Sequence, residues 1–389
     1  MNELTPMDKA KDAFLGLLAT LEGDELLSFE TFVGAAIEQR LQMMNKEYED
    51  QLDGHDHHPG CSHDHSHDTH SDQHVTRSGG SKIFRLNKII QDLREHLPVN
   101  AEAPSEDITI PGSDEFEGFT KDNVVHVDGF LYTEDDVDEL CDAGKLSRNY
   151  CLKCGSKNTK PLNFISHSAS VVQLQFLFQV LLKDRVKDKV VLDVGSRLGA
   201  ILYAGYLLTD AKRLIGVEMN DFFCKLQTDI VQRHRLQDRI EIVHDNLLNC
   251  NSLLERADIV IMNNVFQFFC PIDVQRQLWI FIYSNLRQRK GTILITIPSL
   301  QEQLKDAGFI QLKKPKSNRR KVPAKPPSVM AAAAQSKEDA SSEDLAPFVG
   351  NWSKWLREIE VRVTGQEFVE DIMEDELDNL KLIHMYEVL

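Results

Sequence analysis

Three acidic side chains lie at or near the ends of short apolar runs that have the length and composition of buried strands. The runs cover residues 190–195, 214–218 and 240–245, and the acids are Asp193, Glu218 and Asp245. The carboxyl ends of parallel strands meet at one edge of a sheet, where ligands bind in open α/β folds. Carboxylates gathered there can accept hydrogen bonds from ligand hydroxyl groups. The spacing therefore predicts one cleft that serves a polar ligand.

A glycine-containing turn, Gly195-Ser-Arg-Leu-Gly199, follows the first of these runs. Glycine lets a backbone turn tightly and approach a ligand closely. A dehydrogenase would carry Gly-x-Gly-x-x-Gly to hold a pyrophosphate, and that spacing is absent here. The turn favours a ligand other than a dinucleotide.

Strand-like and helix-like segments alternate around this turn. We expect strands at 190–195, 214–218, 240–245, 258–264 and 291–297, with helices at 200–208, 221–234, 272–287 and 300–307. Such alternation predicts an α/β fold with a doubly wound, mostly parallel sheet.

The arrangement Asp193-x-Gly195-x-x-x-Gly199, with Glu218 and Asp245, resembles the class I S-adenosylmethionine-dependent methyltransferase superfamily. The resemblance covers about residues 170–310 and the C-terminal strand 383–388. It implies a Rossmann-like fold, S-adenosylmethionine as cofactor, a ribose-binding role for Glu218 and an adenine-side role for Asp245. The implied cofactor-binding residues are Asp193, Gly195, Ser196, Arg197, Gly199, Glu218, Met219, Asp245, Asn246 and Asn263.

Arg197 departs from the family pattern, which has a glycine at this place. Its guanidinium can reach the carboxylate of the cofactor's methionine part. Alternatively, it fills the pocket of a domain that has lost its cofactor and serves as a scaffold. The sequence leaves both outcomes open.

The fourth strand ends in Asn263-Asn264-Val265-Phe266, where many family members place groups that face the substrate. Asn263, Asn264 and Phe266 are the candidate substrate-facing residues, although they can equally finish a strand. The Pro-Pro-Tyr/Trp signature of exocyclic-amine or glutamine methylation is absent, and no cysteine is placed as in RNA cytosine-5 enzymes. No catalytic residue is assigned, and the acceptor we consider is a protein side chain.

Cys151-Leu-Lys-Cys154, followed by Gly155, has the spacing of a zinc knuckle. Cys141, in the last turn of a short helix capped by Thr133, and His167 would complete a closed tetrahedral site with a structural role. The alternative is a pair of buried or redox thiols with an unrelated histidine. We expect no strand to lead into Cys151, which disfavours a thioredoxin-like pair.

The remaining chain divides by composition. We expect N-terminal helices at 1–53, a His-rich disordered linker at 54–80, a third helix of the N-terminal unit at 81–100, and an acidic loop with the Cys/His zinc module at 101–169. A methyltransferase-like domain at 170–312 is followed by a disordered basic, then Ala/Ser/acidic, linker at 313–347 and the C-terminal completion of the sheet at 348–389. The His-rich tract is competent for Zn²⁺, Ni²⁺ or Cu²⁺, but flexible tracts also bind metals adventitiously.

The chain has 61 acidic and 44 basic residues, a net charge of −17, and seven cysteines. This acidity disfavours binding to nucleic acid or an anionic membrane, except through the basic run from Lys313 to Lys325. No apolar run approaches the roughly 20 residues that span a bilayer, and the N-terminus lacks a signal-peptide pattern. These features favour a cytoplasmic protein, with the basic run as an alternative nuclear signal. The sequence does not indicate the oligomeric state.

Three functions fit these patterns. The first is a methyltransferase whose N-terminal regions form a lid or substrate platform and whose partner is a protein. The second is a catalytically inactive methyltransferase-like scaffold or interaction protein, and the third is a metal-handling accessory protein. Binding of S-adenosylhomocysteine separates the first two, and metal stoichiometry with and without the His-rich tract tests the third.

Overall fold

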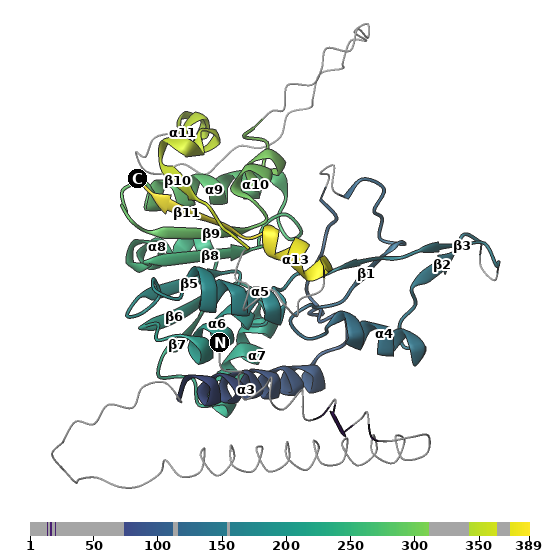
Figure 1. Cartoon of the computed structure of the whole chain (residues 1–389). Coiled ribbons are helices and arrows are strands. Elements are labelled where there is room, and N and C mark those ends of the chain that lie inside the picture. Colours follow the sequence, from purple (N-terminus) through teal and green to yellow (C-terminus); the bar gives the residue numbers. More distant parts are fainter. Residues whose placement is uncertain are drawn as a thin grey trace, which may run out of the picture. The chain divides into compact units, whose positions relative to one another are not determined.

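The computed structural model describes residues 14, 16, 17, 20, 74–111, 116–153, 156–310, 342–363 and 374–389. The chain divides into two compact units, residues 1–70 and 71–389, and the labelled elements of Figure 1 belong to the second. Several predicted features lie outside the described residues: most of the first two helices, the His-rich tract up to residue 73, Cys154 and the basic run from Lys313 to Lys325.

Seven strands form one twisted sheet in the order β10-β11-β9-β8-β5-β6-β7. Their bounds are β5 Val190–Val194, β6 Arg213–Glu218, β7 Ile240–His244, β8 Ile259–Asn263, β9 Ile293–Ile297, β10 Leu356–Ile359 and β11 His384–Val388. Strands β5 to β9 pair in parallel, while β11 runs antiparallel to both β9 and β10. The Rossmann-like, mostly parallel sheet predicted from the sequence is confirmed, including its C-terminal strand.

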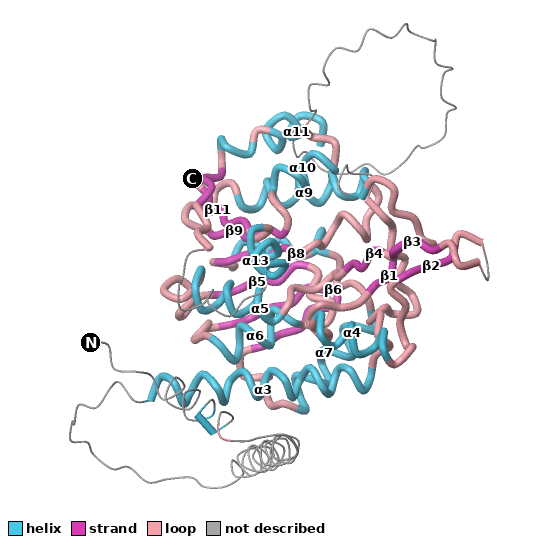
Figure 2. Tube along the Cα trace, turned by 45° about the vertical axis from the view of Figure 1, so that its right-hand side comes forward, coloured by secondary structure: helices cyan, strands magenta, loops and turns pink. Residues whose placement is uncertain are grey.

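Helices cover both faces of the sheet (Figures 1 and 2). One layer contains α3 (His74–His96), α5 (Val171–Gln175) with the π-helical turn Phe176–Leu181, α6 (Ala200–Leu208) and α7 (Asp221–Arg233). The other contains α8 (Asn251–Arg256), α9 (Ile272–Leu286), α10 (Leu300–Asp306) and α11 (Ser342–Gly350). Successive strand residues such as Val191 and Leu192 enter opposite layers, because side chains alternate across a sheet. Burial on both faces explains the continuous apolar runs in the sequence.

Helix α3 packs on the sheet domain. Its buried stripe of Leu86, Ile89 and Leu93 belongs to the same hydrophobic core as α6 and α7. The sequence grouped this helix with the two N-terminal helices instead. The reason for the difference is that an amphipathic stripe shows that a helix has a buried face, but not which neighbour buries it.

Two helices begin inside segments predicted to be linkers. Helix α3 starts at His74, within the predicted 54–80 linker, and α11 starts at Ser342, within the predicted 313–347 linker. Adding a residue to a formed helix is easy compared with nucleating one, so α3 extends from its buried stripe into a polar segment. In α11 the buried Val349 packs against the core of the second layer. The sequence did not predict this contact, because the preceding residues are rich in Ala, Ser and acidic side chains.

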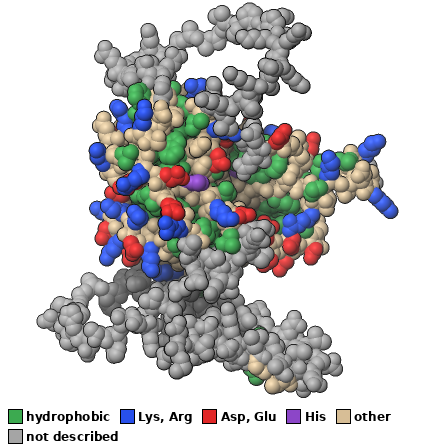
Figure 3. Space-filling view, turned by 45° about the horizontal axis from the view of Figure 1, so that its top comes forward, with side chains coloured by type: hydrophobic (Ala, Val, Ile, Leu, Met, Phe, Trp, Pro, Cys, Tyr) green, Lys and Arg blue, Asp and Glu red, His purple; other side chains and the backbone are tan. Residues whose placement is uncertain are grey.

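Smaller elements precede the sheet. Strand β1 (Val124–His126) pairs in parallel with β4 (Asn163–Ile165), and β2 (Asn149–Cys151) pairs antiparallel with β3 (Thr159–Pro161). Helix α4 (Glu134–Asp142) has the predicted cap at Thr133. A strand therefore does lead into Cys151, contrary to our expectation, and the argument against a redox pair loses that support. Figure 3 shows the β2–β3 hairpin projecting from the surface, with basic side chains at its tip.

The C-terminal segment contains the 3-10 turn Trp352–Lys354 and helix α13 (Glu374–Lys381), which leads into β11. Within the described part of the chain, no helix combines the length and apolarity required to cross a membrane.

Candidate functional site

A large hollow lies at the carboxyl ends of the central strands. Strand β5 has β6 on one side and β8 on the other, so the chain's connections leave it in opposite directions. Such a reversal of strand order is where open α/β sheets bind ligands. A pocket of about 690 Å³ opens there, within the range of small-molecule sites. Eight of the predicted cofactor- and substrate-site residues line it: Gly195, Arg197, Glu218, Met219, Asp245, Asn246, Asn263 and Phe266.

The turn after β5 forms one wall of this pocket. Gly195 has a φ of +72°, and a Cβ atom there would lie 2.3 Å from Val265 Cγ2. Any side chain at this position would collide with the neighbouring loop. The backbone amides of Gly195 and Ser196 both donate to the carbonyl oxygen of Val217 on β6, at 2.8 and 3.1 Å. These bonds fix the turn between the two strand ends.

Glu218 ends β6 with its carboxylate held by two backbone amides. Arg197 N–H donates to Oε2 at 2.9 Å, and Asn220 N–H donates to Oε1 at 2.8 Å. Glu218 is 8% exposed, and burial raises the pKa of this carboxyl although the two amides oppose the shift. Each carboxylate oxygen keeps a further lone pair for a ligand hydroxyl. The sequence-predicted ribose acid is therefore pre-oriented at the pocket wall.

Asp193 lies beneath this wall instead of lining it. It is 3% exposed, and burial, together with the nearby Glu218 charge, raises its pKa to about 8. At neutral pH the carboxyl is mostly protonated. The other predicted cofactor- and substrate-site residues outside the pocket lining are Ser196, Gly199 and Asn264.

Arg197 directs its side chain toward the segment that precedes the sheet. Its guanidinium makes a two-pronged pair with Glu106 (2.9 and 3.1 Å), contacts Asp128 at 3.0 Å and donates to the carbonyl oxygen of Ala101 at 2.7 Å. The charge also lies over the Phe223 ring, 4.9 Å from its centroid. All these groups are buried, and the guanidinium uses its donors on them instead of on a ligand in the pocket. A pocket remains beside it, and the residue does not fill the site.

Residues 101–106 thus form part of the site, which the sequence did not indicate. Ser105, Glu106 and Asp107 line the pocket, and Ser105 Oγ lies 3.5 Å from Asn220 Oδ1 and 3.2 Å from Asn220 Nδ2. The acidic, proline-containing sequence resembled a solvated loop. The arginine at a position where the family has glycine was the one sequence signal, because an arginine beside a buried turn needs carboxylate partners from elsewhere in the chain.

Asp245 follows β7 and lies next to Glu218, because its backbone amide donates to the Glu218 carbonyl oxygen at 3.0 Å. Its Oδ1 accepts from Asn249 Nδ2 at 2.8 Å and from the Asn246 backbone amide at 2.7 Å. The hydrogen bond from Asn249 is the main cause of the lowered pKa of this carboxyl. Asp245 is therefore ionised and able to accept from a ligand's N–H groups. Met219 lies between the two acids in sequence and is 66% exposed.

The end of β8 forms the third side of the pocket, which we call the acceptor end. Asn263 donates through Nδ2 to the carbonyl oxygen of His167 at 3.3 Å. Asn264 has a φ of +49° and does not line the pocket. Phe266 is buried against Trp279, so most of its ring serves the core. Asn263 is the candidate from the sequence that best fits a substrate-facing place.

The three predicted zinc ligands that the structure describes do not form a metal site. Cys141 lies in α4, Cys151 is exposed at the end of β2, and His167 lines the pocket, where its ring contacts His126, Phe268 and Phe269. Within the described ranges, no three His, Cys, Asp or Glu side chains are placed to hold a metal ion. The spacing of His167 after the cysteines predicted a shared zinc site, which the structure does not show, because the His167 ring lies against His126, Phe268 and Phe269 instead. The Cys151–Cys154 pair remains a prediction, because Cys154 lies outside the described residues.

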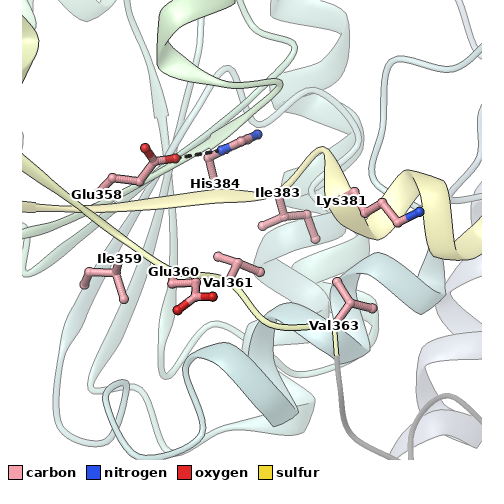
Figure 4. A pocket seen from close by; sticks show the side chains of 8 residues that line it. All are labelled: Glu358, Ile359, Glu360, Val361, Val363, Lys381, Ile383 and His384. Carbon is pink, nitrogen blue, oxygen red and sulfur yellow. Dashed lines mark hydrogen bonds and ion pairs between the residues drawn. The ribbon is translucent and has the colours of Figure 1, made fainter.

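A second hollow of about 430 Å³ lies at the edge of the sheet, between β10, β11 and α13 (Figure 4). Its walls are mainly apolar, and Glu358 contacts His384 at 3.1 Å. It contains none of the predicted site residues and borders residues outside the described ranges. We assign it no function.

Comparison with known proteins gives a partial match. No family model matches the chain. It is 29% identical over 122 residues to the ribosomal protein L11 methyltransferase of Desulforamulus reducens, a similarity that spans 31% of this chain and 37% of that protein. The matched stretch is thus well under two thirds of the relative's length.

Solved structures of methyltransferases also match in part. An RNA methyltransferase from Salinibacter ruber in complex with S-adenosyl-L-homocysteine is 19% identical, covering 34% of this chain and 76% of that one, with a TM-score of 0.25. An O-methyltransferase from Bacillus cereus, also with S-adenosyl-L-homocysteine, is 13% identical, covering 66% and 89%, with a TM-score of 0.33.

Proposed function

We propose that this chain is an S-adenosylmethionine-dependent methyltransferase. The observation that carries the proposal is Glu218, whose carboxylate is held by two backbone amides at the wall of the central pocket. In that place it can accept both hydroxyls of a ribose. The partial sequence similarity to a methyltransferase supports the same activity.

The pocket's residues suit this cofactor. Gly195 leaves room where a Cβ atom would collide, so the turn can lie close to a bound methionine part. Glu218 and Asp245 offer acceptors to the ribose and the adenine side, on neighbouring strands β6 and β7. When bound, the cofactor supplies an electrophilic methyl group on a sulfonium. The chain's own contribution is then to place the acceptor in line with that methyl group, since positioning accounts for much of such catalysis.

The acceptor we propose is a basic group of a protein. Carboxylates dominate the charged lining of the pocket, namely Glu106, Asp107, Glu218, Asp221 and Asp245, whereas Arg197 is paired with Glu106. An acidic cleft attracts cationic substrates and repels phosphate backbones. The relative's name also refers to a protein substrate. These points favour an amine-bearing side chain over a nucleic acid.

Calorimetric titration with S-adenosylhomocysteine tests the cofactor. The parent protein should bind it, and Glu218→Ala should weaken binding tenfold to several hundredfold, because a shielded charge-assisted hydrogen bond is worth about 1.5–3 kcal/mol and water partly replaces the pair that is lost. Glu241→Ala removes an exposed carboxylate on β7 and should leave the affinity unchanged. Undetectable binding by the well-folded parent at millimolar ligand would instead establish the scaffold function.

A further inference from the structure

Two histidines form a hydrogen-bonded pair beside the acceptor end of the pocket. His167 Nε2 lies 2.9 Å from His126 Nδ1. His167 is 5% exposed and lines the pocket, and its other ring nitrogen, Nδ1, has no hydrogen-bond partner among the described residues. A buried polar atom without a partner requires an explanation, and a catalytic role is one of those known.

Two short parallel strands hold this pair in place. His126 ends β1 opposite Ile165 of β4, and His167 lies two residues after the end of β4. The backbone of His167 accepts from Asn263 at the end of β8. The next residue, Ser168, donates to Asp128, which is also paired with Arg197. The pair is therefore fixed to both the glycine turn and the acceptor end.

Both rings are neutral near pH 7. Burial lowers the pKa of His167 well below its usual value, and the charges of Arg197 and His126 lower it further. Burial also lowers the pKa of His126, against the opposing charges of Glu102 and Glu106. A neutral imidazole has one donor and one acceptor nitrogen. If His167 donates through Nε2 to His126, its Nδ1 is the free acceptor.

We propose that His167 is the proton acceptor of the methyl transfer and that His126 is its positioning residue. The inference rests on the proposed function and narrows its substrate. A base at this place serves an acceptor that must lose a proton, such as a protein ammonium group. It would have no use for an acceptor such as a thioether, which has no proton to lose.

The step balances as follows for an ammonium acceptor. The ammonium has no free lone pair, so it first releases a proton to His167 Nδ1. The freed nitrogen lone pair then forms the N–CH₃ bond while the C–S bond breaks, and the electron pair of that bond stays on sulfur. When the methylated product leaves, the proton on His167 Nδ1 passes to water, while the Nε2 proton of His167 stays on the hydrogen bond to His126 Nδ1, so both rings return to their starting forms.

Binding measurements can test this without a known substrate. One probe is an analogue of S-adenosylmethionine in which nitrogen replaces sulfur and an aminoethyl arm replaces the methyl group, which places an amine where the acceptor nitrogen would lie. The control analogue carries a propyl arm of the same size. The parent should bind the amine analogue roughly tenfold or more tightly than the propyl one, because the ammonium donates to His167 Nδ1.

His167→Phe keeps an aromatic ring among Phe268 and Phe269 but removes the nitrogen. It should reduce the affinity ratio of the two analogues to about one, and a cooperative urea unfolding transition shows that the variant is folded. His384→Phe, at the edge of the sheet, is the matched control and should keep the parent's ratio. An unchanged ratio in His167→Phe, or no preference in the parent, would overturn the proposal. Loss of S-adenosylhomocysteine binding by the parent would instead refute the proposed function.

The positioning role of His126 can be tested by measuring which ring nitrogen of His167 carries the proton. Nitrogen NMR of histidine-labelled protein should show His167 protonated at Nε2 and bare at Nδ1. His126→Phe should abolish this preference and lower the analogue ratio by a factor of a few, while His126→Gln, which keeps an acceptor oxygen, should partly restore both. A His167 that is protonated at Nδ1 in the parent would contradict the assigned roles.

Discussion

The backbone amide of Arg197 lies 2.9 Å from Glu218 Oε2, so the residue that replaces a glycine holds the candidate ribose acid with its main chain. Its side chain meanwhile binds carboxylates outside the sheet. The main chain of this residue thus serves the pocket, while its side chain serves the ion pairs. This division explains how an arginine can occupy the turn while the pocket beside it stays open.

Removing the Arg197 side chain should destabilise the protein. Arg197→Ala leaves Glu106 and Asp128 buried without their cation, a loss of about 3–5 kcal/mol. Arg197→Gly should be less harmful by about 1 kcal/mol, because glycine accepts the φ of +43° without strain. Urea unfolding of the parent and both variants measures the two effects. Equal stability of the parent and Arg197→Gly would show that the buried pairs contribute nothing.

Gly195→Ala should damage the cofactor pocket. The new Cβ atom would meet Val265 Cγ2 at 2.3 Å, and the φ of +72° adds backbone strain. We expect at least a tenfold loss of S-adenosylhomocysteine affinity and about 1–3 kcal/mol of destabilisation. Gly118→Ala is the control, since its φ is +87° but open space surrounds it. The idea fails if the two variants lose stability equally and both bind the ligand normally.

Asp193 should make stability depend on pH. The pKa of this carboxyl is raised from 3.8 in the unfolded chain to about 8 in the folded protein. The folded state therefore keeps a proton that the unfolded chain releases, and stability falls as pH rises between these values. Asp193→Asn cannot ionise and should flatten that decline. Urea midpoints of both proteins across this pH range provide the check, and parallel curves would contradict the prediction.

Leu93→Ala in α3 should destabilise the sheet domain by about 2–5 kcal/mol, because the side chain is fully buried in its core. Gln91→Ala, on the exposed side of the same helix, should change stability little. The transition should be followed by tryptophan fluorescence, since Trp279 and Trp355 are buried in the opposite helical layer of the sheet domain. A normal tryptophan transition in Leu93→Ala would place α3 outside this cooperative unit.

Much of the sheet could be predicted because its strands are apolar on both faces. The predicted helix at 200–208 matches α6, and the strand near Glu218 ends where expected. Strand β10 was missed, since it is short and only Leu356 is buried while Arg357 and Glu358 face solvent. Edge strands commonly carry such charges, which erases the apolar pattern.

The site was only partly predictable, for a different reason. Glu218 and Asn263 are found from sequence because each ends a strand whose position the pattern defines. His126 and His167 depend on the pairing of β1 with β4, across 41 residues of chain. No local pattern reveals such a pairing, and metal-ligand spacing assigned His167 to the wrong neighbours.

The ion pairs of Arg197 with Glu106 and Asp128 span 91 and 69 positions of the chain. During synthesis both carboxylates leave the ribosome well before the arginine that neutralises them. Two groups that later become buried must therefore stay hydrated until the glycine turn emerges, because an unpaired buried charge is too costly. The wall formed by residues 101–106 can close only after the first strand and turn of the sheet are complete. A shortened chain starting at residue 170 would expose that side of the pocket to water and leave Arg197 without its anionic partners.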